Sequence, residues 1–131
     1  MWSAPGFAPS GLHFFSSWSI IFLFITEIYH GGGKMVIAEL AIFPTSEGSS
    51  VSRYVREVIK LIESSGLRSE TGAMSTTIEA PDLASILKVV SDCHRLLIEM
   101  GARRIHINLR VDHRLDKEAT MNSKLKAVGK R

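Results

Sequence analysis

The sequence predicts an α+β domain of the ferredoxin-like type, a βαββαβ sandwich in which a four-stranded antiparallel sheet carries two helices on one face. Three observations predict this fold. Two stretches repeat apolar residues at helical spacing, four short stretches have the composition or alternation of strands, and both helical stretches end in glycine just before a strand. The chain has 131 residues, 45% of them apolar, which suits one such domain rather than two.

The first strand is expected over residues 36–43, where an apolar and β-branched run leads up to Pro44. Because side chains alternate along a strand, Ile37, Glu39 and Phe43 are expected to share one face. The opposite face is entirely apolar. We therefore expect it to lie under the helices.

The first helix follows a polar loop and has apolar residues at helical spacing between residues 51 and 62. Ser49 or Ser50 is expected to cap this helix, because a side-chain oxygen can satisfy a free backbone N–H at a helix start. Gly66 is expected to end it in the left-handed conformation that glycine adopts easily.

Two short strands, 67–73 and 74–80, are expected to form a hairpin with Gly72 near its turn. The second helix is expected to open at Pro81-Asp82 and to end at Gly101. The repeated order of helix, glycine and strand supports an internally two-fold layout, in which the last strand and the third strand both lie beside the first.

The last strand, expected over 104–112, alternates most clearly between an apolar and a polar face. The sheet face away from the helices then gathers polar side chains from three neighbouring strands. The candidate ligand-binding residues on this face are Glu39, Phe43, Ser75, Thr77, Asn108 and Arg110. The competing interpretation is a half-solvated sheet face without a ligand.

This face also carries apolar and aromatic residues, so we expect it to pack against another subunit rather than remain solvated. A carboxylate buried there needs a partner because desolvating a charge is costly. Arg110 or a cationic ligand would supply that partner for Glu39.

The two ends of the chain differ from the domain between them, which is expected over residues 35–112. Residues 1–34 hold most of the aromatic residues and are expected to be a disordered or non-native leader, with Met35 as the true start. A targeting or membrane-surface segment and a structured addition remain alternatives. The apolar run 18–25 has eight residues, fewer than the roughly 20 that cross a bilayer. Residues 113–131 are expected to form a basic tail, either frayed or folded into a short helix on a neighbour.

Charge and composition exclude several classes of protein. Residues 112–131 hold six basic and three acidic residues, and the other 111 residues sum to zero charge, so we expect no nucleic-acid partner. The lone Cys93 suits a buried position in a reducing compartment, and we expect a cytoplasmic protein. We expect no metal, because His106 and His113 are too far apart for a compact motif, and no cofactor. No nucleophile–base pair is apparent, so no enzymatic activity is expected.

Four segments, in this order, resemble the small thiamine-binding protein family. They are Met35 to Leu40 (MVIAEL), Ser50 to Val55 (SVSRYV), Met74 to Glu79 (MSTTIE) and Arg110 to Lys117 (RVDHRLDK). The likeness covers about residues 35–128. It implies a ferredoxin-like fold whose sheets pair into dimers, with dimers pairing into tetramers. It also implies binding of thiamine or its hydroxymethylpyrimidine part without catalysis.

The resemblance implies roles for the candidate residues. Glu39 would bond an aminopyrimidine or offset the thiazolium charge. Ser75, Thr77 and Asn108 would orient the ring, and Phe43 would stack on it. An oligomeric regulatory or assembly protein without a vitamin ligand is the alternative, because this fold serves many functions. The sequence leaves open the natural ligand and whether it is transported, stored or sensed.

Overall fold

The computed structural model describes residues 34–130, so the leader predicted over residues 1–34 lies outside the described residues except for Lys34. The predicted βαββαβ order is confirmed, and a third helix follows it. The strands are β1 (Val36–Pro44), β2 (Arg68–Thr71), β3 (Thr76–Ala80) and β4 (Ile105–His113), and the helices are α2 (Ser52–Ser64), α3 (Leu83–Glu99) and α4 (Met121–Ala127).

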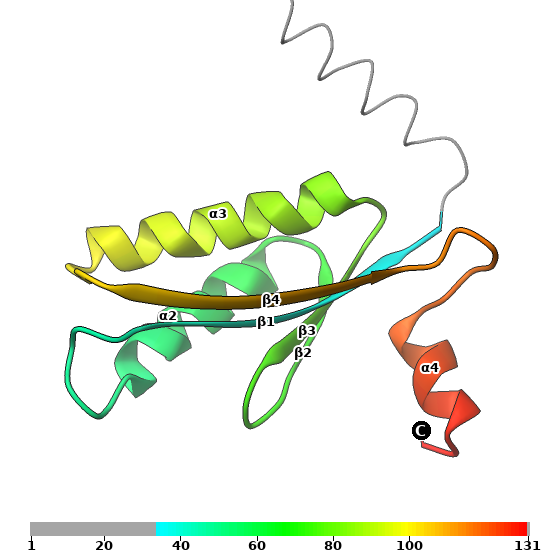
Figure 1. Cartoon of the computed structure of the whole chain (residues 1–131), viewed down its shortest axis with the longest axis horizontal. Coiled ribbons are helices and arrows are strands. Elements are labelled where there is room, and N and C mark those ends of the chain that lie inside the picture. Colours follow the sequence, from blue (N-terminus) through cyan, green and yellow to red (C-terminus); the bar gives the residue numbers. More distant parts are fainter. Residues whose placement is uncertain (1–33, 131) are drawn as a thin grey trace, which may run out of the picture. The chain divides into compact units, whose positions relative to one another are not determined.

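The four strands form one antiparallel sheet with the order β2-β3-β1-β4. The first strand therefore lies between the third and the last, as predicted. β1 and β4 pair over nine residues each, and Figure 1 shows them side by side along their length. β2 and β4 are the two edges of this sheet.

One face of the sheet forms the core with α2 and α3. The core side chains of β1 are those of the predicted apolar face, and buried residues of β3 continue it. The buried members are Val36, Ala38, Leu40, Ile42, Ile78 and Ala80 from the sheet, Tyr54, Val58 and Ile62 from α2, and Ile86, Val89, Cys93 and Leu97 from α3. Burial raises the pKa of the Cys93 thiol to about 11, which keeps it protonated and unreactive at neutral pH.

The predicted cap of the first helix is wrong. α2 starts after Val51, whose carbonyl accepts hydrogen bonds from the backbone N–H groups of Tyr54 and Val55, both at 3.0 Å, and no side chain caps this end. Because the helix starts this late, Ser49 lies too far back to cap it, and the Ser50 hydroxyl instead lies 3.4 Å from that of Ser52. The prediction for the second helix is confirmed, since the Asp82 carboxylate accepts the backbone N–H of Ser85 at 2.7 Å.

The hairpin strands are shorter than predicted. Residues 72–75 form the connection, which is closed by a 2.8 Å hydrogen bond from the N–H of Gly72 to the carbonyl of Ser75. Ser75 consequently lies just before β3 rather than within it. Both helices do end at a glycine of positive φ, Gly66 at +80° and Gly101 at +92°, as predicted.

The C-terminal tail forms a helix, α4, which is one of the two alternatives expected for it. α4 packs on the sheet of its own chain, because Met121 at its start is 4% exposed and bonds Glu79 of β3. Thr120 and Ser123 bond each other's backbone N–H at its N-terminus, which stabilises so short a helix. No helix within residues 34–130 is long and apolar enough to traverse a bilayer.

Candidate functional site

The sheet face turned away from α2 and α3, called the open face below, carries the polar side chains of all four strands. Strand register aligns them in rows that cross the sheet. The row beside α4, called the anchor row, holds Arg68, Glu79, Ile37 and Asp112. The next row, called the candidate row, holds Glu70, Thr77, Glu39 and Arg110.

α4 packs against the anchor row. Its first turn bonds the row twice, from the N–H of Met121 to Oε2 of Glu79 at 2.7 Å and from Nη2 of Arg68 to Oδ1 of Asn122 at 2.7 Å. Ile37, which lies between Glu79 and Asp112 in the register, is 8% exposed. The open face is therefore closed at this end by the chain's own C-terminal segment.

Charges hold the anchor row and α4 together. Lys124 of α4 forms an ion pair with Asp112, which holds the pKa of that carboxyl below its usual value. Glu79 is 7% exposed, and its carboxylate accepts a hydrogen bond from a backbone N–H at the start of α4, where the helix dipole favours a negative charge. Glu79 and Asp112 thus serve the attachment of α4.

Glu39 stands at the centre of the candidate row. It lies directly opposite Thr77 of β3 and Arg110 of β4, and all three side chains point to the open face. Directly opposite residues in antiparallel strands have Cβ atoms about 5 Å apart. A carboxylate, a hydroxyl and a guanidinium therefore converge on one small area, which can hold a polar ring with both donors and acceptors.

Four carboxylates lie on the open face, and three of them are engaged. Glu79 binds the Met121 amide, Asp112 pairs with Lys124, and Glu70 pairs with Arg68 at 3.1 Å. Glu39 is exposed and, within residues 34–130, has no hydrogen bond or ion pair. It is the open-face carboxylate that remains available to an external group.

Beyond the candidate row, away from α4, the open face carries the small apolar side chain of Ala41 and then a pair of aromatic rings. Ala41 faces Asn108 in the register, and Phe43 faces His106. The Phe43 and His106 rings are 5.2 Å apart between centroids and tilted by 36°. This pair offers a flat surface on which a heteroaromatic ring can stack.

Five of the six predicted site residues lie on the open face by strand register, and the sixth, Ser75, lies outside the strand ladder. Sequence reasoning missed the part played by Glu79 and by α4. The signal was the Thr120 and Ser123 pair, which has the spacing of a helix cap ahead of Met121. In residues 34–130 no group of three or more His, Cys, Asp or Glu side chains is arranged to hold a metal ion.

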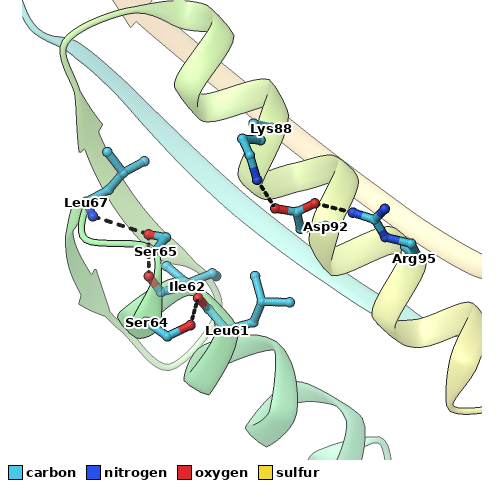
Figure 2. Close-up of polar contacts among 8 residues, drawn as sticks. All are labelled: Leu61, Ile62, Ser64, Ser65, Leu67, Lys88, Asp92 and Arg95. Atoms are coloured by element: carbon cyan, nitrogen blue, oxygen red, sulfur yellow. Dashed lines mark hydrogen bonds and ion pairs between the residues drawn. The ribbon is translucent and has the colours of Figure 1, made fainter.

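A hollow of about 660 Å³ lies elsewhere, between α2 and α3. Figure 2 shows that three of its four charged residues are paired with one another, since Lys88 and Arg95 both bond the Asp92 carboxylate and lower its pKa. The hydroxyls of Ser64 and Ser65 donate to carbonyls of their own helix, at 2.8 and 2.6 Å. This hollow has the volume of a ligand site, but it presents few free polar groups.

Comparison with known sequences finds one matching family profile and several similar proteins. The sequence profile of the family described as "Thiamine-binding protein" matches residues 38–129. The UPF0045 protein MJ1052 of Methanocaldococcus jannaschii is 40% identical over 96 residues, which cover 73% of this chain and 94% of that protein. The UPF0045 protein YqgV of Bacillus subtilis is 34% identical over 101 residues, covering 73% and 96%.

Solved structures agree with the observed fold. The crystal structure of MJ1052 superposes with a TM-score of 0.68 at 39% identity, covering 75% of this chain and 99% of that one. A candidate thiamine biosynthesis/salvage protein of Thermotoga maritima gives a TM-score of 0.63, covering 72% and 98%. At 24% identity the second likeness bears on the fold alone.

Proposed function

The chain belongs to the thiamine-binding protein family, and from this premise we propose that it binds thiamine or its hydroxymethylpyrimidine part on the open face. The observation that carries the proposal is Glu39, the open-face carboxylate without a partner in the described part of the chain. An aminopyrimidine offers N–H donors that a carboxylate accepts, and the thiazolium of thiamine offers a positive charge.

The surroundings of Glu39 support the same ligand. Thr77 and Asn108 provide hydrogen-bonding groups on either side of β1, and Phe43 provides a ring face for stacking. In this proposal Arg110, which lies opposite Glu39 but forms no ion pair with it, is a further contact of the ligand. Ser75 lies just before β3, outside the strand register.

A single sheet face cannot enclose a ligand, since binding sites bury most of the surface of a small molecule. We therefore infer that the open face of a second copy closes the site, in line with an assembly of dimers that pair into tetramers. The family is named for binding, and the proposal includes no catalytic step, no metal and no nucleic-acid partner. It has the protein in the cytoplasm, where a lone thiol such as Cys93 stays reduced.

Isothermal titration calorimetry with thiamine and with hydroxymethylpyrimidine tests this function. We expect both to bind, and Glu39→Gln to weaken thiamine binding by about tenfold to a hundredfold, because a charge-assisted hydrogen bond contributes about 1.5–3 kcal/mol. Glu63→Gln, which removes an exposed carboxylate from α2, is the matched control and should bind like the wild type.

Two results would speak against the proposal. Absence of heat and of a thermal shift with both compounds would refute vitamin binding. If Glu39→Gln then changed the oligomer mass, the alternative of an assembly protein that uses the open face only for subunit contacts would be favoured.

A further inference from the structure

The charges of the anchor row are balanced by α4. Arg68 carries one positive charge, and Glu79 and Asp112 each carry one negative charge, so the row by itself is negative by one charge. α4 contains two lysines and no acidic residue. One of them, Lys124, forms the ion pair with Asp112 and brings the sum to zero. This end of the open face is therefore neutral because α4 is attached to it.

A single guanidinium connects α4 with the candidate row. Nη2 of Arg68 donates to Oδ1 of Asn122 in α4 at 2.7 Å and to Oε1 of Glu70 at 3.1 Å. Glu70 lies opposite Thr77, which in turn lies opposite Glu39. Neighbouring rows are two residues, or about 7 Å, apart along a strand. This is less than the screening length of about 8 Å at physiological salt, so the charge of the anchor row acts on a group bound at Glu39.

We propose that α4 sets the preference of the open face between a positively charged ligand and a neutral one. The inference rests on the proposed function and adds an element of specificity to it. While Lys124 pairs with Asp112, the anchor row adds no net attraction for a cation such as the thiazolium of thiamine. Without Lys124, Asp112 attracts that cation as well. The neutral hydroxymethylpyrimidine gains nothing from this charge, so α4 favours the neutral compound relative to thiamine.

The two lysines of α4 differ in position, which provides a matched control. An α-helix turns by about 100° per residue, so side chains two positions apart lie on nearly opposite sides. Lys124 reaches Asp112 on the sheet. Lys126 is exposed, lines a hollow with Leu125 and Lys130, and has no ion pair within the described residues. Removing either lysine changes the net charge of the protein equally, but only Lys124 neutralises the anchor row.

Isothermal titration calorimetry of the full chain with both compounds tests the proposal, at low salt and at a mildly alkaline pH where hydroxymethylpyrimidine is neutral. We expect Lys124→Gln to tighten thiamine binding by about threefold to tenfold, which is the effect of a unit charge about 7 Å away at a protein surface. Binding of hydroxymethylpyrimidine should not change. Lys126→Gln should bind both compounds like the wild type, and the thiamine effect should disappear at about 1 M salt, where screening acts within about 3 Å.

A double variant separates the charge from the attachment of α4. Lys124→Gln combined with Asp112→Asn lacks the same ion pair, but the charges of Arg68 and Glu79 then balance. We expect this variant to return to the thiamine affinity of the wild type, even if α4 is loosened. Amide hydrogen exchange at residues 121–127 measures the attachment in each variant.

Binding and attachment must influence each other equally, because linkage is reciprocal. Saturating thiamine should therefore speed amide exchange in residues 121–127 of the wild type, and hydroxymethylpyrimidine should not. If both compounds bind but thiamine has equal affinity for Lys124→Gln and Lys126→Gln, or if the double variant binds it as tightly as Lys124→Gln, the proposal is overturned and the proposed function stands. If neither compound binds, the proposed function fails and this inference with it.

Discussion

The attachment of α4 through a buried carboxylate is the feature that we expect to respond most strongly to a single substitution. Glu79 is 7% exposed and accepts the N–H of Met121 at 2.7 Å. Glu79→Ala removes the acceptor and leaves the backbone N–H of Met121 without this hydrogen bond. Glu79→Gln keeps an oxygen that can accept the bond but removes the charge.

The size of the effect follows from this geometry. A hydrogen bond to a charged group contributes about 1.5–3 kcal/mol to stability, so Glu79→Ala should cost about 2 kcal/mol. In a domain of this size each kcal/mol lowers the melting temperature by about 4–8 °C. We therefore expect a decrease of about 8–16 °C for Glu79→Ala and a smaller one for Glu79→Gln.

The assay needs two readouts because α4 can detach without unfolding the sheet. Thermal denaturation followed by circular dichroism measures global stability, and amide hydrogen exchange at residues 121–127 measures the attachment of α4. Glu70→Ala is the control, since Glu70 is an exposed carboxylate on the same face, paired only with Arg68. If Glu79→Ala matched this control in both melting temperature and α4 exchange, our account of the anchor row would be wrong.

Two further predictions concern the same fold. The ion pair with Lys124 lowers the pKa of Asp112. Its contribution to the stability of the α4 attachment is therefore present above the ordinary aspartate pKa of about 3.9 and is lost as the pH falls through the lowered pKa of the folded protein. Amide hydrogen exchange in α4 should rise in that acidic range, and Asp112→Asn should remove this part of the pH dependence. Gly66→Ala should destabilise the domain by about 1–2 kcal/mol in urea denaturation, because φ at this position is +80°. An added Cβ would meet no atom within 4 Å, so the cost comes from the backbone conformation alone. Gly72→Ala, at a glycine without a positive φ, is the control.

The sequence could predict those parts of the fold where apolar and polar residues alternate strongly or where a glycine marks the end of a helix. In β1 the residues on either side of Glu39 are buried apolar side chains, so only one face could hold the carboxylate. The glycines after both helices marked their ends because a left-handed residue is costly for any other side chain. These signals are local, and they fixed which face each site residue occupies.

The parts that could not be predicted depend on long-range packing. The tail is polar except for a few residues, so its periodicity did not reveal that Met121 is buried against the sheet. Ser75 looked like a strand residue by alternation, but closure of the turn by Gly72 took it out of the ladder. Serine is a typical helix-capping residue, but the N-cap position of α2 is Val51, so neither Ser49 nor Ser50 caps the helix.

The contrast between Glu39 and Glu79 explains how one face can hold both a structural contact and the proposed binding site. Both glutamates point to the open face from adjacent strands, in neighbouring rows. α4 engages Glu79, which removes it from the surface, whereas Glu39 lies on the central strand and has neighbours on both sides but no partner within residues 34–130. Strand pairing on both sides fixes the backbone at Glu39, so a ligand of this carboxylate has only its side-chain rotamers to order. Detaching α4 would return the Glu79 charge to the same face, one row from Glu39, and so change the electrostatics of the proposed site. In this proposal α4 therefore influences ligand binding although it supplies none of the proposed ligand contacts.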